Sequence, residues 1–393
     1  MAPTLAAKLR SLRIGSGMTL DALAASSGVS VRGISDIERG RSARPHPRTL
    51  DAPGAALRLD AETNAWLWSS VLVVPSRQGQ GIPPAPTRDF VGRADELAQL
   101  TAILSATAPT AAVVTGPPGI GKTALIVEAL ALSSSSRHRV FLDMAGIDRE
   151  EQSSAILQSI LAQCGHDHIP TNAALASSAW ERWCAQRSTV VHVENVTNED
   201  QLRIVQGGDP DVIVASSRRR LSGLPVTKVL LGPLDDEAAR KLLESSSAFD
   251  ARDEVSLRAL LAACAGLPLA LRIVANRLRG DQLMTADDLV SRMGPDRHHV
   301  AALVAGDLSL SAALQASYCL LSTRAAALFR TIGSLDSRTF AIREVTEASG
   351  EDEWRVIDGL DEIAEVGLIE PMSGLRYRAL ELVRLYACGL SEE

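Results

Sequence analysis

The segment from residue 116 to residue 123 has the sequence GPPGIGKT, and it follows an apolar run that predicts a buried strand. Glycines at this spacing let main-chain N–H groups turn inward around an anion, and a helix that begins here directs its positive dipole end to the same point. Lys122 adds a cation, and Thr123 adds a hydroxyl that suits Mg²⁺. The pattern predicts a phosphate-binding loop (P-loop) for a nucleoside di- or triphosphate. The alternative is a plain glycine turn between strand and helix.

Length and composition limit the class of protein. The chain has 393 residues, 46% hydrophobic and 3% aromatic, which suffices for two to four domains with aliphatic cores. No apolar run approaches the roughly 18 residues of a membrane span, and the N-terminus has no signal-peptide pattern. We therefore expect a cytoplasmic protein without membrane contact. The net charge of −7 is uneven, because residues 1–60 carry +4 and the remainder −11.

Three short helices are predicted in the basic N-terminal segment. Leu5 to Ile14 has apolar residues at helical spacing, and Thr19 can cap a second helix. Ser30 can cap a third helix that ends at Gly40. Two short helices joined by a tight glycine turn form a helix-turn-helix.

The outward face of the third helix suits the major groove of DNA. If Ile34 and Ile37 face the core, a turn of about 100° per residue places polar side chains on the opposite face. The residues expected to contact DNA are Arg32, Ser35, Arg39 and Arg41. The alternative is a small helical bundle with solvated charges, in which Asp36 pairs with Arg32 and Arg39. Residues 1–60 thus form a candidate DNA-binding region.

Residues 9–50, especially the run VSVRGISDIERG at 29–40, resemble the XRE-type, lambda-repressor-like helix-turn-helix of bacterial regulators. The resemblance implies DNA binding. Two features depart from the family: Gly33 lies mid-helix, where glycine costs about 1 kcal/mol relative to alanine, and Pro53 and Gly54 interrupt the place where the last helices usually continue. Either the fourth helix begins late, or the head is partly degenerate.

A linker and an α/β sheet follow this head. Residues 75–86 have few apolar side chains and many breakers, which is typical of an extended linker. Beyond them, apolar runs alternate with helical stretches, as in a parallel sheet. The predicted strands are Ala111–Thr115, Val140–Asp143, Thr189–Glu194, Val212–Ser216 and Lys228–Leu231.

Glu194 ends the third predicted strand, at the edge where a P-loop protein holds an acid near Mg²⁺. The alternative is a surface glutamate at a strand end, and His192 is expected to be a core residue. Asn195 stands where fast ATPases usually place a second carboxylate that orients water. An amide is no general base, so catalysis stays uncertain, and we expect at most a slow ATPase used as a switch.

The span from Phe90 to about Ala387 resembles the NB-ARC module of STAND-class signalling ATPases, particularly the actinobacterial branch with a helix-turn-helix head. The landmarks are FVGR at 90–93, the P-loop, EN at 194–195, SRRRL at 217–221 and GLPLAL at 266–271. The resemblance implies ATP or ADP with Mg²⁺ as the ligand. It also implies that Val91 lines the adenine pocket, that Pro268 packs on the base and that Arg218 senses the γ-phosphate.

These observations together define the expected site. The expected cofactor-binding residues are Val91, Gly116, Gly119, Ile120, Gly121, Lys122, Thr123, Ala124 and Pro268. The expected catalytic residues are Lys122, Glu194 and Arg218, and the expected Mg²⁺ ligands are Thr123 and Glu194. Taken alone, residues 218–220 could be a solvated cluster, and residues 266–268 could simply end one helix and start another.

The segment from Leu308 to Tyr386 resembles the winged-helix segment of the same family. Where the family has Met-His-Asp, this chain has Ala379, Leu380 and Glu381, so the histidine that would contact the ADP β-phosphate is absent. The resemblance then implies that the ADP-bound, closed conformation is less strongly stabilised than in other members of the family. No repeat of about 20–50 residues is visible, so we expect the ligand sensor to be missing, separate or replaced by a partner protein.

The predicted architecture is multidomain. It comprises an all-α helix-turn-helix head at residues 1–70, a linker at 71–88, a P-loop α/β domain with a parallel sheet at 89–232, an α-helical domain at 233–300 and a winged-helix-like segment at 301–393. The predicted function is a transcription regulator that exchanges ADP for ATP, forms a homo-oligomer with ATP and binds DNA. The alternative is a signalling or defence ATPase whose head mediates protein assembly. A metabolic P-loop kinase is disfavoured, because no acceptor pocket with a catalytic base is evident.

Overall fold

The computed structural model describes most of the chain from residue 83 onward and three helices before it. The described residues are 5–27, 29–39, 56–57, 83–87, 89–133, 136–145, 147, 152–166, 169–246, 254–280, 285–293, 300, 303–306 and 308–390. The chain divides into two compact units, residues 1–75 and residues 76–393, and each is described by itself.

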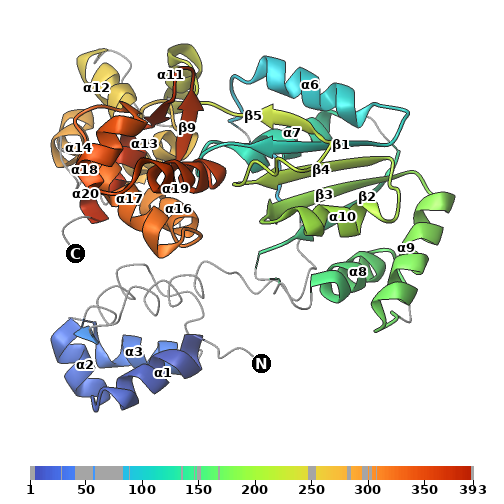
Figure 1. Cartoon of the computed structure of the whole chain (residues 1–393), viewed down its shortest axis with the longest axis horizontal. Helices are drawn as coiled ribbons and strands as arrows, with labels where there is room; N and C mark the ends of the chain where they lie inside the picture. The colour runs from blue at the N-terminus through green and yellow to red at the C-terminus, as the bar shows by residue number, and fades with distance from the viewer. Residues whose placement is uncertain are drawn as a thin grey trace. The chain divides into compact units, whose positions relative to one another are not determined.

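The N-terminal unit contains the three predicted helices. They are α1 (Leu5–Gly15), α2 (Leu20–Ser27) and α3 (Val31–Glu38) (Figure 1). Both predicted caps are confirmed: Thr19 Oγ1 accepts from the main chain of α2 at 3.0 Å, and Ser30 Oγ accepts from that of α3 at 3.1 Å. Ile34 and Ile37 are buried as predicted. The third helix ends at Glu38, shortly before the predicted end at Gly40.

An ion pair joins the first and third helices of this unit. The Arg13 guanidinium donates to both carboxylate oxygens of Glu38, at 2.6 and 2.9 Å, and also to the main-chain oxygen of Met18 at 2.8 Å. Only 12% of the Arg13 side chain and 6% of the Glu38 side chain are exposed. The bond to Glu38 raises the pKa of Arg13. This bidentate pair fixes the end of α3 against α1.

A five-stranded parallel sheet forms the centre of the second unit, and all five predicted strands are confirmed. They are β1 (Thr110–Thr115), β2 (His138–Asp143), β3 (Thr189–Val196), β4 (Val212–Ser217) and β5 (Thr227–Leu230). The spatial order is β2-β3-β4-β1-β5. Since β1 and β3 flank β4, their carboxyl ends lie two strands apart on one edge.

Helices cover both faces of this sheet (Figure 1). On one face lie α6 (Ala94–Leu104) and α7 (Lys122–Leu132), and on the other α8 (Gln152–Gln163), α9 (Ala173–Gln186) and α10 (Glu199–Gln206). Ala112 and Val114 of β1 pack into the core beneath α6 and α7, whereas Val113 packs into the core beneath α8, α9 and α10. The strand is therefore buried on both faces, as its continuous apolar run predicts.

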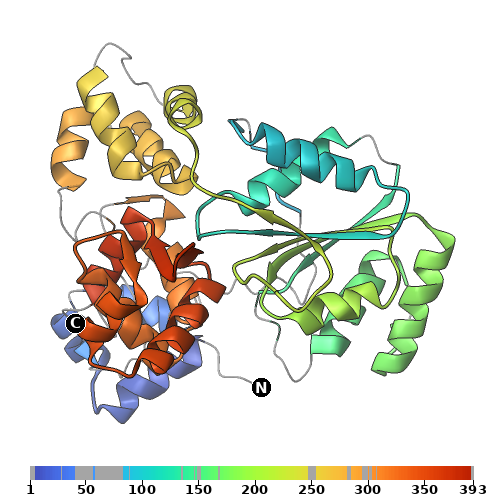
Figure 2. The same ribbon diagram turned by 45° about the horizontal axis from the view of Figure 1, so that its top comes forward.

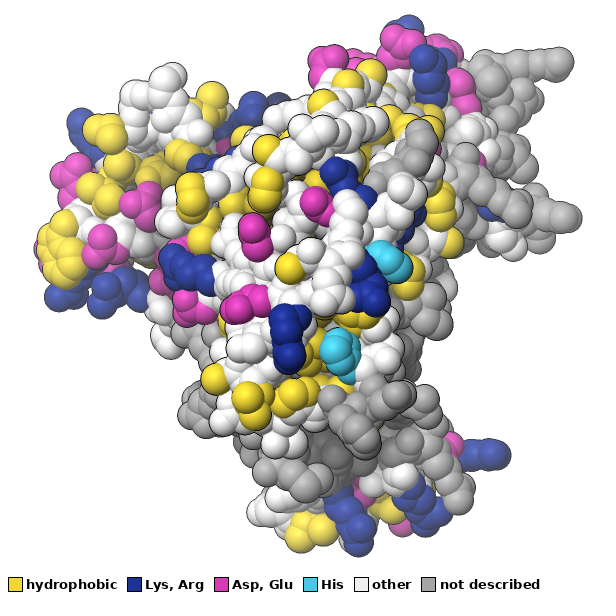
Figure 3. Space-filling model, turned by 90° about the vertical axis from the view of Figure 1, so that its right-hand side faces the viewer, with side chains coloured by type: hydrophobic (Ala, Val, Ile, Leu, Met, Phe, Trp, Pro, Cys, Tyr) yellow, Lys and Arg dark blue, Asp and Glu magenta, His cyan; other side chains and the backbone are white. Residues whose placement is uncertain are grey.

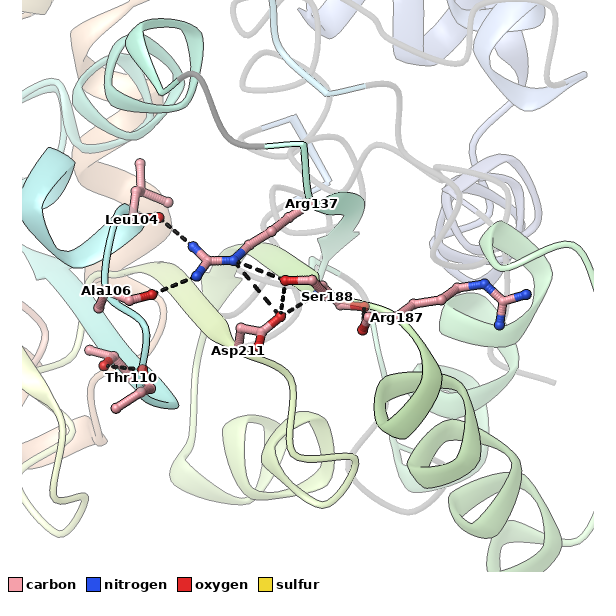
Figure 4. A network of polar contacts seen from close by, with 9 residues as sticks. Leu104, Ala106, Thr110, Arg137, Arg187, Ser188 and Asp211 are labelled. Carbon is pink, nitrogen blue, oxygen red and sulfur yellow. Dashed lines mark hydrogen bonds and ion pairs between the residues drawn. The ribbon is translucent and has the colours of Figure 1, made fainter.

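Polar contacts join the segments that lead into the strands, at the edge opposite the P-loop (Figure 4). The Arg137 guanidinium donates to the main-chain oxygens of Leu104 and Ala106 and to Ser188 Oγ. Asp211 accepts from Ser188 Oγ and from the main chain of Thr189, both at 2.6 Å. These contacts hold the amino ends of the strands together.

Two helical segments follow the sheet, and Figure 2 shows them as separate groups of helices. The first comprises α11 (Asp236–Ser246), α12 (Glu254–Cys264), α13 (Pro268–Gly280) and α14 (Ala286–Met293). The short strands β6 (Val304–Ala305) and β7 (Leu308–Ser309) lead to the second. The second comprises α16 (Leu310–Tyr318), α17 (Thr323–Gly333), β8 (Thr339–Ala341), α18 (Ile342–Ser349), α19 (Glu353–Glu365), β9 (Ile369–Met372), β10 (Arg376–Ala379) and α20 (Glu381–Gly389). Its strands form an antiparallel sheet in the order β8-β10-β9.

Across the described ranges, no helix is long and apolar enough to cross a bilayer. On the face drawn in Figure 3, acidic and basic side chains are mixed with apolar ones.

Candidate nucleotide-binding site

The P-loop connects β1 to α7 and adopts a conformation that needs its glycines. Gly116 has φ of 149°, and a Cβ there would lie 2.6 Å from the main-chain oxygen of Leu231. Gly119 has φ of 76°, and a Cβ there would lie 2.8 Å from the Cβ of Leu269. Side chains at these positions would both strain the backbone and collide with neighbouring residues. The loop thus brings its backbone close to the segments that follow the sheet.

Lys122 begins α7, and its ammonium lies under the P-loop. The Nζ atom donates to the main-chain oxygens of Gly116 at 2.8 Å and Pro117 at 3.0 Å. The pKa of Lys122 is lowered to about 7, first by burial and then by the charge of Arg218, while the charge of Glu194 opposes this shift. A cation whose charged form is disfavoured in this way is suited to an anionic ligand. The negative charge of phosphate oxygens would stabilise the protonated form of Lys122. The residues present therefore fit a nucleotide.

Glu194 is buried at the carboxyl edge of the sheet. It is 5% exposed, which rules out the alternative of a surface glutamate. Thr123 Oγ1 donates to Glu194 Oε2 at 2.8 Å, and Ser216 Oγ donates to the same oxygen. His192 Nε2 lies 2.7 Å from Glu194 Oε1. The two expected Mg²⁺ ligands, Thr123 and Glu194, are therefore in direct contact.

A magnesium ion would need further oxygen ligands at this point. In the portion of the chain that is described, no group of three or more His, Cys, Asp or Glu side chains could hold a metal ion. Mg²⁺ is usually held by one or two protein oxygens together with water and substrate phosphates. Thr123 and Glu194 fit that arrangement, in which a bound nucleotide completes the coordination.

His192 and Ser216 are functional neighbours that the sequence analysis missed. His192 is 4% exposed and packs edge-on against Phe141, so the prediction of a core residue is correct. Its contact with Glu194 follows from their spacing of two residues on β3, which directs both side chains to one face. Ser216 comes from β4, and no local signal in the sequence points to it.

Asn195 has left-handed backbone geometry, with φ of 57°, at an irregularity in the pairing of β3 with β4. Its side-chain amide donates to Asp143 Oδ1 at 2.9 Å. Asp143 lies at the end of β2, and the same oxygen accepts from the main chain of Ala145 at 3.0 Å. A carboxylate, that of Asp143, thus lies beside Asn195. Its Oδ1 atom accepts hydrogen bonds from the Asn195 amide and from the main chain of Ala145.

Arg218 leaves the end of β4 and points to the C-terminal segment. Its guanidinium donates to the main-chain oxygen of Ala313 at 2.9 Å and to Ser317 Oγ at 3.2 Å, both on α16. Burial lowers the pKa of Arg218. The alternative of a solvated cluster therefore does not hold for Arg218.

A cavity of about 400 Å³ lies above the P-loop. Of the expected site residues, the structure brings ten to its wall: Val91, Gly119, Ile120, Gly121, Lys122, Thr123, Ala124, Glu194, Arg218 and Pro268. Gly116 is not among the residues of the wall. Its main-chain oxygen accepts the hydrogen bond from Lys122 Nζ. The volume is typical of small-ligand sites.

Both helical segments reach the P-loop. The main-chain N–H of Leu269, in the first turn of α13, donates to the oxygen of Gly119 at 3.1 Å. Gly367, after α19, packs so closely that a Cβ would lie 3.1 Å from the Arg218 oxygen and 3.3 Å from the Gly116 oxygen. Pro268 begins α13, which agrees with the alternative that residues 266–268 end one helix and start another. It also lines the cavity, as the family resemblance implies. The sequence analysis did not identify the contact of Gly367.

Leu380 stands where the resembling family has its histidine. It precedes α20 and packs against the hydrophobic core. It is not one of the described residues that line the cavity.

The expected DNA-contacting residues lie on α3 or beyond it. The Arg32 side chain is 93% exposed and lies 3.9 Å from the Asp36 carboxylate, a weak pair. Ser35 is half-buried and Arg39 is exposed. Arg41 lies outside the described residues. Arg32 on α3 and Arg39 at its C-cap are thus both exposed to solvent.

Two families match the chain. The helix-turn-helix domain family matches residues 4–67, and the AAA ATPase domain family matches residues 89–365. The second match alone covers more than half of the chain.

Two curated relatives are regulatory proteins of Streptomyces. The regulatory protein AfsR of Streptomyces griseus is 28% identical over 328 residues, and that of Streptomyces coelicolor is 26% identical over 332 residues. Each match covers 79% of this chain and 33% of the relative, so the chain spans about a third of their length. A solved structure, the Walker-type ATPase of Pyrococcus abyssi, matches 78% of this chain and 98% of that chain, with 14% identity and a TM-score of 0.48.

Proposed function

Because this chain belongs to the AAA ATPase domain family, we propose that residues 89–393 hold an adenine nucleotide whose exchange controls a DNA-binding head. The chain is then a transcription regulator switched by ADP and ATP. The match of residues 4–67 to a helix-turn-helix family and the similarity to AfsR regulatory proteins support this proposal. The P-loop, with the buried Lys122 beneath it, supports the nucleotide as its ligand.

The finer family assignment is part of the proposal. We assign the head to the XRE type and the body to the NB-ARC module of STAND ATPases. The boundaries are 1–70, 71–88, 89–232, 233–300 and 301–393, as the sequence predicts. For the last segment, the order β8, α18, α19, β9, β10 with an antiparallel sheet supports a winged-helix-like fold.

Each expected site residue has a role in this proposal. The backbone of the P-loop and Lys122 bind the phosphates, and Thr123 and Glu194 hold Mg²⁺, which neutralises phosphate charge when bound. Val91 and Pro268 enclose the base. The contact between Thr123 and Glu194, at 2.8 Å, supports their shared role.

We infer the nucleotide switch from the contact between Arg218 and α16. While the guanidinium donates to Ala313 and Ser317, it is committed to the C-terminal segment. A γ-phosphate at the P-loop would compete for the same guanidinium, because phosphate is a stronger acceptor than a neutral oxygen. ADP lacks that group. ATP therefore favours release of α16, whereas ADP leaves the contact intact.

We propose at most slow hydrolysis. Asn195 cannot accept a proton from water, and Asp143 is engaged with the Asn195 amide and the main chain of Ala145. Both bonds reach Asp143 Oδ1 and make this carboxylate a weaker base, so we infer slow turnover, which suits a switch.

Oligomerisation would link the switch to DNA. A single head covers one half-site, so pairing two heads through ATP-bound bodies would raise both affinity and the precision of spacing. The protein would act in the cytoplasm, and its signal would reach it through a sensor or partner.

Two measurements on the full chain test the proposal. Calorimetry with Mg²⁺ should detect binding of ADP or ATP to the wild type, and Lys122→Ala should weaken that binding by about 10-fold or more, since it removes a charge-assisted contact. Gel shifts on genomic fragments should show sequence-preferring binding that depends on the nucleotide. Absence of such binding with either nucleotide contradicts the proposal.

The rival function is a signalling or defence ATPase whose head mediates protein assembly. The exposure of Arg32 and Arg39 favours DNA binding, because both arginines are available to phosphates or base edges. The double variant Arg32→Ala/Arg39→Ala separates the two functions. If it retains activity in cells while Lys122→Ala abolishes it, the rival is correct.

A further inference from the structure

The wall of the nucleotide cavity carries more positive than negative side chains. Among the described lining residues, four are cationic and two are acidic: Arg93, Lys122, Arg218 and Arg272 against Asp89 and Glu194. An excess of one charge in a cleft concentrates ligands of the opposite charge. The wall therefore suits an anionic ligand, as the proposed nucleotide is.

The cations of this wall differ in what they already bind. Arg93 donates to the main-chain oxygen of Gly232, Lys122 donates to two P-loop oxygens, and Arg218 donates to α16. Among the residues that the structure describes, none forms a hydrogen bond or an ion pair with the half-buried Arg272. Its guanidinium, which carries five donors, is therefore available to a ligand.

Arg272 lies on the helix whose first turn contacts the P-loop. The Leu269 N–H donates to the Gly119 oxygen at 3.1 Å, and a Cβ on Gly121 would lie 3.9 Å from the Cγ of Pro268. Pro268 and Arg272 are four residues apart on α13, so they share one face of the helix, and both line the cavity. Long side chains on a helix point back toward its N-terminus. The Arg272 side chain is therefore directed to the end of α13 that touches the P-loop.

We propose that Arg272 binds a phosphate that ADP and ATP share, and thereby holds α13 to the bound nucleotide. The inference rests on the proposed nucleotide site and adds to it a cation from the first helical segment. A guanidinium can bind phosphate through two parallel hydrogen bonds, which charge makes stronger than bonds to neutral groups. The base and the ribose are neutral, so the phosphates are the part of the ligand that matches this side chain.

The shared phosphates are favoured over the γ-phosphate by what α13 contacts. The main chain of a P-loop surrounds the α- and β-phosphates, while its lysine reaches the β- and γ-phosphates. α13 contacts that main chain through Leu269. Arg218, which the proposed function assigns to the γ-phosphate, comes instead from the end of β4. Arg272 is thus placed for the phosphates that both nucleotides carry.

The test compares Arg272→Gln and Arg272→Lys with the wild type in the full chain, using calorimetry with Mg²⁺ and either ADP or ATP. We expect Arg272→Gln to bind both nucleotides about 10-fold more weakly, by the same factor, because it loses a charge-assisted contact. Arg272→Lys keeps the charge and should recover part of the affinity. The penalty of Arg272→Gln should shrink at high salt, since salt screens the attraction between charges.

A control and a second readout separate ligand binding from a structural role. Arg279→Gln is the matched control, because Arg279 lies on the last turn of the same helix, is exposed and is not among the residues that line the cavity. It should leave nucleotide affinity unchanged. Since Arg272 has no partner among the described residues, Arg272→Gln should leave the melting temperature of nucleotide-free protein unchanged.

The outcomes are distinct. Equal affinity of Arg272→Gln and wild type overturns the inference, and so does a penalty for ATP without one for ADP, which would indicate a contact with the γ-phosphate. A penalty that Arg272→Lys shares and that salt does not change would indicate an uncharged contact with base or ribose. A lower melting temperature of nucleotide-free Arg272→Gln would indicate a structural role. Both of these results contradict the proposal. If the wild type binds neither nucleotide, the proposed function itself fails.

Discussion

The Arg218 guanidinium donates a hydrogen bond to the main-chain oxygen of Ala313, 2.9 Å away. The bond connects the end of a central strand with a helix that begins 92 residues later in the chain. Ser317, one turn further along α16 and fully buried, accepts a second bond from the same nitrogen. The C-terminal segment is therefore attached to the edge of the sheet that carries the P-loop.

Ser317→Ala should weaken this attachment and speed nucleotide exchange. The bond from a charged donor is worth about 1.5–3 kcal/mol at most, and Ala313 keeps part of it, so we expect ADP to dissociate several-fold faster. Stopped-flow release of a fluorescent ADP measures the rate. Ser311→Ala is the matched control, because Ser311 lies on the same helix and donates to Val300 at 3.2 Å. Equal release rates for Ser317→Ala and wild type would argue against a role of this contact in the switch.

Glu194→Gln should remove the dependence of nucleotide binding on magnesium. Glutamine preserves the shape but not the charge that attracts the ion, so we expect at least about 10-fold weaker binding of Mg-ATP. In EDTA, variant and wild type should bind alike. Glu237→Gln serves as control, since its carboxylate is 78% exposed and pairs with Lys241 on the surface of α11. A similar loss in EDTA would show that Glu194 acts through the fold instead.

Gly208→Ala should destabilise the α/β domain. A Cβ there would lie 2.1 Å from Trp180 Nε1, and this fully buried indole donates to the Val205 oxygen at 2.9 Å. The ring must move and lose that bond, which costs about 2–4 kcal/mol. Urea unfolding followed by tryptophan fluorescence tests this. Gly280→Ala has open space around its Cβ and should change the midpoint little; comparable midpoints for both variants would disprove the prediction.

Two ion pairs in the described part of the head should differ in how strongly their substitution changes stability. Glu38→Gln leaves the largely buried Arg13 without its charged partner, and we expect about 2–3 kcal/mol loss of head stability. Arg32→Ala removes a 93% exposed side chain and should change stability by less than about 0.5 kcal/mol. It should nevertheless lower DNA affinity. Calorimetric melting and gel shifts measure the two effects, and a stable Glu38→Gln head would refute the role of the pair.

Local patterns predict the elements of this fold well. The apolar runs identify all five strands, and for the central strands β1, β3 and β4 the reason is that a strand buried on both faces must be largely apolar. Thr19 and Ser30 identify helix starts, because capping needs only a side chain and an amide three residues later. Such signals lie within a few residues, so they are visible in the sequence.

Contacts between distant segments are not predictable in this way. Ser216 meets Glu194 only because β4 pairs with β3, and strand order leaves no periodic signal. The bond from Asn195 to Asp143 likewise depends on the pairing of β2 with β3. The approach of Gly367 to the P-loop depends on how a whole segment packs. Site residues that share one sequence motif could therefore be predicted. The residues that contact them from distant segments could not.

The bond between the Leu269 N–H and the Gly119 oxygen joins two main-chain groups. Any residue except proline can supply that N–H, so position 269 is free to change over evolutionary time as long as its bulk still fits against a glycine. Divergent descendants could therefore retain this junction of helix and loop with little residual identity around it. Its persistence would depend on keeping a glycine at 119.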